Sequence, residues 1–594
     1  MKVPGVDSKN LSSSPNPNLA LYFNIMCGRS LTFLSPVAIG LLLLVASVSA
    51  FHVQRTTTRH ATALLVDGQN MAGGARHLVG DIIRSLQPSY LRQVKETIEK
   101  RGRGSLIVDT SSMVDNAPSW EELRQRLFQV QTPSERKFRV DLERGAGDPS
   151  ALANKRLFRG DTQPRVTFYR DSAAWCPYCA KVWMALEERR VSYEVVKIDM
   201  RCYGKNKPTE FLKMQPNGNL PCVVIEGRVI SESDEIVYAV DQVGSSQTPR
   251  LRPRGGTPQA ELFRELCDNG RNSLERRLYS RWMWWLTGVR RPAEYKDLFE
   301  EHLDEVEEAL VAAPNGGPYF LGKELSEVDI RFGPFIERQI ASLAYFKGYN
   351  IRDGSRPCLQ RWLRAMESRA SYRATKSDWY THSQALPPQL SADCAPESGH
   401  EELQGLIDDL PVHSAVGDSI EQNNSFWIEP GWDWCSDPAA AKREAAERVI
   451  HNHADIVRFA SRAAGVPGLP ASAAPLADPR ATPSKAAEPA VDLLLRHTVN
   501  SLLASSGRIG IFSSMSQQPG SSARDVDAAV ASLASGPSGI ESAQAVADCL
   551  DYLRARVGVP RDMTHTAAQQ LRAELKGVSV RLRSAVGMKE KISA

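Results

Sequence analysis

Apolar and polar residues alternate as in β-strands in one part of this chain and follow the period of an α-helix in others. The change from one pattern to the other indicates where the domains lie. Two β-rich runs, "RVTFYR" (165–170) and "SYEVVKI" (192–198), flank a helical pattern at 177–189. That order predicts a β-α-β unit, in which a helical crossover joins two parallel strands. The apolar runs of "LPCVVIEGRVIS" then predict a hairpin around Glu226-Gly227, and a final helix is expected at about 232–243.

The order strand, helix, strand, hairpin, helix within residues 161–245 is that of a thioredoxin-like α/β domain. A connection rich in Pro, Gly and Arg at 245–259 ends the β-rich pattern. Helical periodicity follows at 259–287, 294–312, 326–345 and 357–369. Residues 259–385 are therefore expected to form an all-helical domain.

Further segments flank these two domains. We expect a polar helical lead-in at 71–160, an extension with a helix at 386–464, an Ala/Pro-rich linker at 465–489 and a helical tail at 490–594. Within the lead-in, a helix is expected at 119–130, where Ser119 can act as N-cap and Glu122 follows three residues later. The other helices are expected at 433–464, 490–504, 540–557 and 565–585, with a Ser/Gly-rich loop at 512–525. The linker composition cannot pack a core. The expected fold class is a thioredoxin-like domain, then an all-α domain, then an α-helical extension.

The N-terminal residues have the composition of a targeting sequence. Residues 1–50 are predicted to be a leader and signal peptide, because an apolar core at 37–48 is preceded by Arg29 and followed by small residues. Residues 51–70 are basic and hydroxyl-rich, as transit peptides are. The two segments resemble the bipartite plastid presequence of algae, which predicts a plastid location; the secretory pathway is the alternative. Translation is expected to start at Met1 or Met26.

Charge and cysteine content narrow the function classes. The 73 Lys and Arg against 69 Asp and Glu leave a net charge of +4, so no nucleic-acid partner is expected. The apolar segment is too short to span a bilayer comfortably, so no stable membrane insertion is expected after processing. Ten cysteines in 594 residues are sparse for a disulfide scaffold, which favours a compartment where thiols are reduced.

One pair of cysteines, in "AAWCPYCAKVW", carries the candidate chemistry. Pro177 suits the first position of a helix, which would make Cys176 the N-cap. There the unpaired N–H groups and the helix dipole favour the thiolate and lower the thiol pKa below its free value of about 8.5. Cys176 is therefore the predicted nucleophile.

The second cysteine, Cys179, is spaced for the buried face of the same helix, together with Val182, Trp183 and Leu186. Cys179 can act slowly as a resolving cysteine, which attacks a disulfide formed at Cys176, or take no part in the reaction. A zinc site lacks a second ligand pair at suitable spacing, so no metal is expected. A structural disulfide is disfavoured, because so short a loop gains little from closure.

Three stretches together resemble a known family: "WCPYC", "KNKPTEFLKMQPNGNLPCVV" and "ISESDEIV", in this order and before an all-helical domain. They look like the cysteine-type glutathione S-transferases, close to the omega class and the glutaredoxins. The resemblance covers about residues 160–385, and the lead-in and tail are similar to those of plastid glutathione S-transferase-like proteins of plants and algae. It implies glutathione as co-substrate, and it allows a homodimer.

The resemblance also implies roles for downstream residues. Pro221 matches the family's cis-proline, and the backbone of Leu220 would pair with the peptide of glutathione. Ser233 and the helix N–H groups would bind the γ-glutamyl carboxylate, with Glu232 on its ammonium group. Lys207 matches the lysine that meets the glycyl carboxylate. Taken singly, each of these residues could equally be a surface, capping or turn residue.

An acceptor site is a weaker prediction. In "RRLYSRWMWWLTGVRR", the residues Tyr279, Trp282 and Trp285 lie on the first helix of the second domain and could line a site for a large apolar substrate. Their helical spacing favours the alternative, that they are core and domain-interface residues.

The expected reaction follows from having a cysteine where conjugating transferases carry a hydroxyl. A thiolate attacks sulfur and forms a mixed disulfide with glutathione. The predicted activity is glutathione-dependent thiol transfer, acting on glutathione mixed disulfides or on dehydroascorbate. The alternatives are conjugation of glutathione to electrophilic substrates, and a non-catalytic glutathione-binding module with a helical tail that docks a partner.

Overall fold

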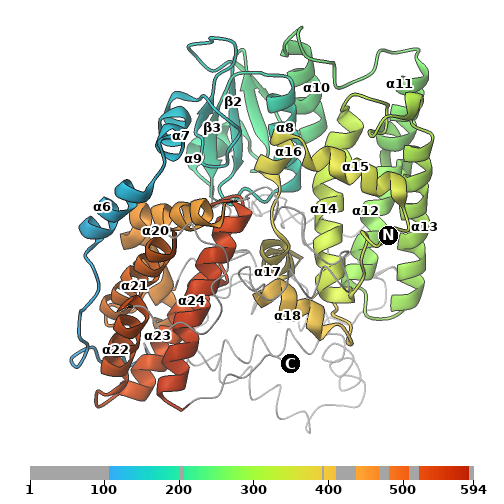
Figure 1. The fold of residues 1–594 in the computed structure, drawn as a ribbon. Helices are drawn as coiled ribbons and strands as arrows, with labels where there is room; N and C mark the ends of the chain where they lie inside the picture. Colours follow the sequence, from blue (N-terminus) through green and yellow to red (C-terminus); the bar gives the residue numbers. More distant parts are fainter. Residues whose placement is uncertain are drawn as a thin grey trace, which may run out of the picture. The chain divides into compact units, whose positions relative to one another are not determined.

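The structure is a computed structural model (Figure 1). It describes residues 106–199, 207–390, 394–409, 437–466, 481–506 and 521–587. The predicted leader, signal peptide and transit-peptide-like segment lie outside the described residues, as does the start of the lead-in. No helix within the described ranges combines the length and the apolar character needed to cross a bilayer.

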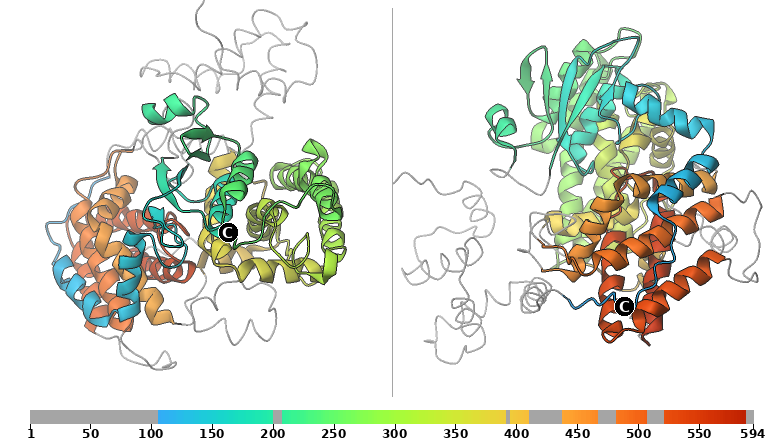
Figure 2. Two further views of the ribbon diagram at one scale, coloured as in Figure 1. Left: turned by 90° about the horizontal axis from the view of Figure 1, so that it is seen from above. Right: turned by 90° about the vertical axis from the view of Figure 1, so that its left-hand side faces the viewer.

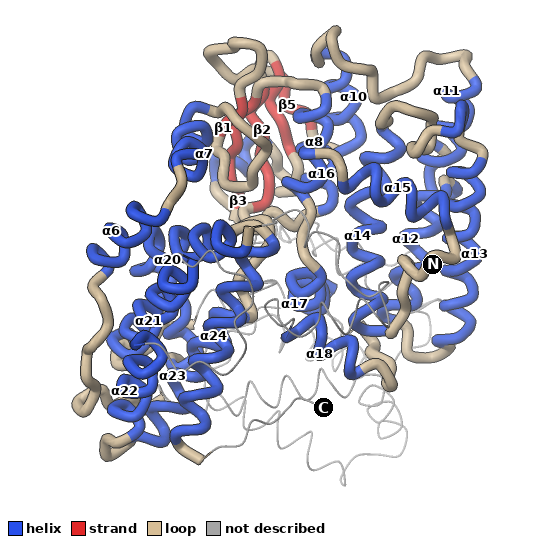
Figure 3. Tube along the Cα trace, viewed as in Figure 1, coloured by secondary structure: helices blue, strands red, loops and turns tan. Residues whose placement is uncertain are grey.

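A five-stranded sheet forms the first domain (Figure 3). Its elements are β1 (Lys155–Arg156), β2 (Val166–Asp171), α8 (Pro177–Glu188), β3 (Tyr193–Ile198), α9 (Thr209–Met214), β4 (Cys222–Ile225), β5 (Arg228–Ile230) and α10 (Ser233–Val243). β2 and β3 are parallel, while β4 pairs antiparallel with β2 and with β5. The predicted β-α-β unit, hairpin and thioredoxin-like fold are confirmed.

The hairpin turns at Glu226 and Gly227, which both have positive φ, at 51° and 78°. Such a turn matches the twist of the two strands that it joins. The strand that sequence periodicity missed is β1: it comes from the lead-in and pairs antiparallel with β3 at the sheet edge. Two residues are too few to show an alternating pattern.

The all-helical domain follows. It contains α11 (Pro258–Phe263), α12 (Leu274–Thr287), α13 (Pro292–Val311), α14 (Glu327–Lys347), α15 (Pro357–Glu367), α16 (Ala370–Thr375), α17 (Trp379–Leu390) and α18 (Glu401–Asp409). The expectation of one helix through 259–287 is wrong, because a π-helical turn at Arg264–Asp268 and a 3-10 turn at Gly270–Asn272 separate α11 from α12. Every residue of α14 except Tyr345 is buried.

Segments far apart in the sequence share a second core (Figure 2). It is built from α6 (Trp120–Val130), α20 (Pro438–Ala460), α21 (Glu488–Ser506), α22 (Ser521–Ala534), α23 (Gly539–Arg554) and α24 (His565–Ala585). Leu123 and Leu127 of α6 are buried in this core, and the Trp120 indole donates to Asp492 of α21 at 2.8 Å. We call these helices the bundle.

Helix α22 was not expected from the sequence, which predicted a Ser/Gly-rich loop up to residue 525. Its buried face has helical spacing and is made by Val526, Ala529, Val530 and Leu533. Two of these four residues are β-branched valines, which have a low helix propensity, and Ala529 is too small to mark an apolar face clearly.

The first residue of α24, His565, is buried where the bundle meets the helical domain. Burial lowers its pKa to about 4, with Asp378 opposing and Lys376 and Arg572 reinforcing that effect. The imidazole is therefore neutral at neutral pH, and its Nε2 is 2.7 Å from the Gln569 amide nitrogen.

This buried histidine predicts a loss of stability in acid. An unfolded histidine binds a proton below about pH 6.5, whereas His565 binds one only near pH 4, so the free energy of unfolding falls as pH drops between these values. Its full contribution is at most about 3 kcal/mol. The midpoint of urea unfolding should therefore depend less on pH in His565→Gln than in the wild type. The exposed His451→Gln is the control and should behave as the wild type does; equal pH dependence in all three proteins would contradict the prediction.

Candidate active site

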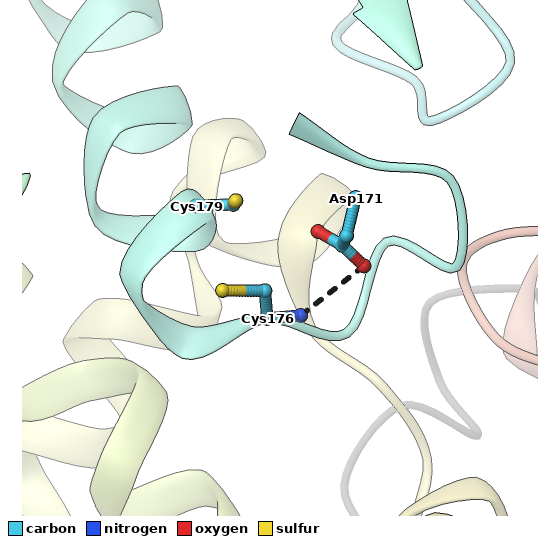
Figure 4. Close-up of side chains that lie close together, drawn as sticks. All are labelled: Asp171, Cys176 and Cys179. Atoms are coloured by element: carbon cyan, nitrogen blue, oxygen red, sulfur yellow. Dashed lines mark hydrogen bonds between the residues drawn. The ribbon is translucent and has the colours of Figure 1, made fainter. Parts of the chain in front are cut away.

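The CPYC sequence begins helix α8 as predicted (Figure 4). Cys176 is the N-cap and Pro177 the first helical residue. Both Cys176 and Cys179 are free thiols. Cys176 is 9% exposed and Cys179 2% exposed, so the helix register makes the two sulfurs unequal in access.

Asp171, the last residue of β2, organises the loop that leads to Cys176. Its Oδ2 accepts the N–H of Trp175 at 2.9 Å and that of Cys176 at 3.4 Å. One carboxylate oxygen and the two sulfurs all lie within 4.8 Å of one another (Figure 4). The sequence interpretation missed Asp171; the signal was an acidic residue at the end of a buried strand, five residues before the first cysteine.

The same three residues could offer donor atoms to a metal ion, and they are the one such group among the described residues. Three donors are one fewer than a closed tetrahedral zinc site takes. Oδ2 of the carboxylate already accepts hydrogen bonds from two backbone amides.

Electrostatics separate the two thiols further. Burial, the hydrogen bond with Cys176 and the negative charges nearby, including Asp171, raise the pKa of Cys179 well above its usual value. Cys179 is therefore protonated at neutral pH, and it is a poor nucleophile.

The predicted cis-proline is cis: the Leu220–Pro221 bond is one of two cis peptide bonds in the described part of the chain. Pro221 is buried and directly precedes β4, while Leu220 is half-buried. Lys207 does not extend into solvent; it is 7% exposed and donates to the carbonyl oxygen of Gly218, in the loop before Leu220. The Lys207 side chain therefore contacts the same loop that carries the Leu220–Pro221 bond.

The Glu232–Ser233 pair lies where it was expected, at the N-terminus of α10. Ser233 is buried, and Glu232 is exposed with a positive φ of 59°. Positive φ is unfavourable for a residue with a side chain and is concentrated at functional sites. The N-terminus of α10 offers unpaired N–H groups of the kind that bind carboxylates.

An ion pair that the sequence did not reveal joins the two helices that begin at these sites. Lys181 of α8 is fully buried, and its Nζ lies 3.2 Å from Oδ1 of Asp234 in α10. Arg331 of α14 approaches Oδ2 of the same carboxylate at 3.1 Å. Although burial opposes ionisation, these two cations hold the pKa of Asp234 below its usual range. The ion pair therefore ties the helix of the nucleophile to the helix of Glu232 and Ser233.

The three aromatic residues of the predicted acceptor site lie in different surroundings. Tyr279 packs edge-to-face on Phe335, as does Tyr178, the neighbour of Pro177, with ring centroids 5.3 Å and 5.5 Å apart. Trp282 and Trp285 are buried in the core, and their indoles donate to Ser342 and Glu397. Of the three, Tyr279 is the one that packs on Phe335 of α14, the ring on which Tyr178 of the CPYC helix also packs.

Comparison with known families identifies both domains. Residues 175–243 match the N-terminal domain of glutathione S-transferases, and residues 271–365 match their C-terminal domain. The thioredoxin-like domain and the all-helical domain are therefore the two halves of a glutathione S-transferase fold, to which the bundle is an addition.

Individual relatives match about a third of the chain. Glutathione S-transferase DHAR3, chloroplastic, of Arabidopsis thaliana is 25% identical over 204 residues, which cover 34% of this chain and 69% of that protein. Protein IN2-1 homolog B of Oryza sativa subsp. japonica is 28% identical over 225 residues, covering 37% and 82%. The solved structure of dehydroascorbate reductase from Chlamydomonas reinhardtii matches at 22% identity with a TM-score of 0.29, covering 35% of this chain and 91% of that one.

The unequal sulfurs predict selective alkylation. Near neutral pH, iodoacetamide should label Cys176 at least about tenfold faster than Cys179, because the thiolate is the reactive form and burial keeps Cys179 protonated. Fragment mass spectra of the labelled peptide assign the site. Cys222, buried with its pKa raised to about 11, is the internal reference for a slow thiol. Faster labelling of Cys179 than of Cys176 would show that the assignment is inverted.

Proposed function

We propose that this protein is a glutathione-dependent thiol transferase in which Cys176 carries glutathione as a mixed disulfide. The observation that carries the proposal is the position of Cys176: it is a thiol at the N-cap of α8, and the Lys181–Asp234 ion pair joins this helix to the first turn of α10, which begins at Glu232 and Ser233. Relatives named glutathione S-transferase and glutaredoxin support glutathione as the co-substrate.

The reaction has two steps. The Cys176 thiolate attacks the glutathione sulfur of a glutathionylated substrate; the substrate sulfur leaves as a thiolate and takes up a proton. A second glutathione, as its thiolate, then attacks the glutathione sulfur bound to Cys176, which releases oxidised glutathione and regenerates the Cys176 thiolate. With dehydroascorbate as acceptor, two glutathione thiols supply the two electrons and two protons.

Residues around the nucleophile divide the binding of glutathione between them. The N-terminus of α10 and Ser233 bind the γ-glutamyl carboxylate, Glu232 binds the ammonium group, and the backbone at Leu220 pairs with the peptide. Lys207 binds the glycyl carboxylate, for which it would exchange its present contact with Gly218. Tyr279 and Tyr178 then face the acceptor.

We also propose that the protein acts in the plastid, where the predicted bipartite presequence would direct it. The names of three relatives, from Arabidopsis thaliana and Oryza sativa, include the word chloroplastic, which supports that location.

Replacing Cys176 tests the proposal directly. After incubation with oxidised glutathione, intact-protein mass spectrometry should find one glutathione adduct on the wild type and on Cys179→Ser, and none on Cys176→Ser at the CPYC site. Reduction of a glutathione mixed disulfide should fall at least about a hundredfold in Cys176→Ser, because a serine hydroxyl cannot form the disulfide. Full activity in that variant would refute the mechanism, and retained conjugation of an electrophilic aromatic would favour a conjugating transferase.

The ion pair between α8 and α10 predicts a defect in binding. Asp234→Asn should raise the KM for glutathione about tenfold, equivalent to about 1.4 kcal/mol, because Lys181 and Arg331 lose the charge that holds α10 against α8. Steady-state kinetics with varied glutathione measure the effect. Glu235→Gln, an exposed position in the same helical turn, serves as the matched control; an equal KM in both variants would show that the ion pair does not shape the site.

A further inference from the structure

The nucleophile is held from the helical domain as well as from its own. Arg338 of α14 donates to the carbonyl oxygen of Trp175, the residue before Cys176, and to that of Pro334 at 2.5 Å. The Arg338 residue is 5% exposed, so its charge is directed onto main-chain oxygens inside the protein. This contact joins the two halves of the transferase fold at the residue next to the active sulfur.

Both main-chain polar groups of Trp175, its N–H and its carbonyl oxygen, are therefore hydrogen-bonded. Its N–H is bound by Asp171 of the α/β domain at 2.9 Å, and its carbonyl by Arg338 of the helical domain. The preceding residue, Ala174, has a positive φ of 55°, a conformation that a side chain disfavours and that surrounding contacts must maintain. The direction in which the chain enters Cys176 depends on these contacts.

Next to Arg338 on α14, Glu337 binds the segment that connects to the bundle. Its Oε1 accepts the N–H of Ser377 at 2.8 Å and lies 2.6 Å from Nε2 of His382. Although burial opposes ionisation, the hydrogen bond with His382 and the charge of Arg338 hold the pKa of Glu337 below its usual value. Two neighbouring residues of α14 thus face the active-site loop and the 377–382 segment.

That segment is in turn bound by the bundle. Asp378 forms a buried ion pair with Arg572 of α24, and Arg572 also donates to Thr381 at 3.0 Å and to the carbonyl of Val557 at 2.6 Å. Ser377 donates to the carbonyl of Val559 at 2.5 Å. A buried ion pair loses its partner only at a large cost, so this junction is specific.

We propose that Arg338 is a positioning residue for Cys176, and that the bundle keeps it in place through Arg572, the 377–382 segment and Glu337. The proposal rests on the proposed function in taking Cys176 as the nucleophile. It gives the bundle a role: the bundle fixes the loop that presents the reactive sulfur. The groups proposed to bind glutathione are elsewhere, on α10, on the Leu220–Pro221 loop and at Lys207. The affinity for glutathione is therefore independent of the bundle, whereas the position of the Cys176 sulfur depends on it.

The experiment uses the full chain and two readouts: the rate at which iodoacetamide labels Cys176, and kcat and KM for glutathione in thiol transfer. In Arg338→Met, labelling and kcat should both fall about tenfold while KM for glutathione changes less than about twofold. Arg338→Lys keeps a buried donor and should recover a part of both. Arg572→Met removes the bundle's side of the ion pair with Asp378, and it should lower both the labelling rate and kcat about threefold.

Arg443→Met is the matched control, because Arg443 is a buried bundle arginine whose ion-pair partners, Glu135 and Asp437, are separate from the junction. It should leave both readouts at wild-type values.

Wild-type labelling and kcat in both Arg338 variants would overturn the positioning role. Wild-type values in Arg572→Met, or a loss in Arg443→Met equal to that in Arg572→Met, would overturn the role of the bundle. If Arg338→Met does not fold, Arg338→Lys and Arg572→Met decide. A wild type without thiol transfer but with fast Cys176 labelling refutes the proposed function alone, since the labelling series still tests the positioning.

Discussion

Helix α14 is buried along almost its whole length, so each charge on it must find a partner inside the protein. The partners of these charges come from the segments packed around α14. Arg331 reaches Asp234 of the α/β domain, Arg338 reaches the carbonyl of Trp175, and Glu337 binds the segment that leads to the bundle. The charged groups of one buried helix thus connect the parts of the transferase fold to one another, and the N-capping box of Ser326 and Asp329 fixes where that helix begins.

The difference in burial between the two CPYC thiols is a second consequence of helix geometry. A three-residue spacing at a helix N-terminus leaves one sulfur at the cap and turns the other toward the core, so burial acts on the two thiols differently. The carboxylate of Asp171 accepts hydrogen bonds from the amides of Trp175 and Cys176, and its negative charge contributes to the raised pKa of Cys179. One thiol is left at the N-cap of the helix, and the second is kept protonated in the core.

The bundle shows where periodicity is informative and where it is not. Helices α20, α21, α23 and α24 were predicted from apolar spacing, and α6 from the capping box at Ser119 and Glu122. That α6 and the C-terminal helices share a core was not predicted, because a pattern on one helix does not say which other helix covers it. The ion pair of Asp378 with Arg572 is of the same kind: each residue alone looks like a solvated surface charge.

The sequence by itself determined the local features: the β-α-β order, the hairpin turn, the N-cap position of Cys176 and the buried face of Cys179. These follow from spacing and backbone chemistry within a few residues. The Leu220–Pro221 and Glu232–Ser233 motifs came from the resemblance to cysteine-type glutathione S-transferases. Only the tertiary structure decided that Trp282 and Trp285 belong to the core, and that Asp171, Asp234 and Arg338 converge on the site. Ion pairs and hydrogen bonds between distant segments depend on how whole helices pack, and packing leaves no periodic trace in the sequence of the charged residues themselves.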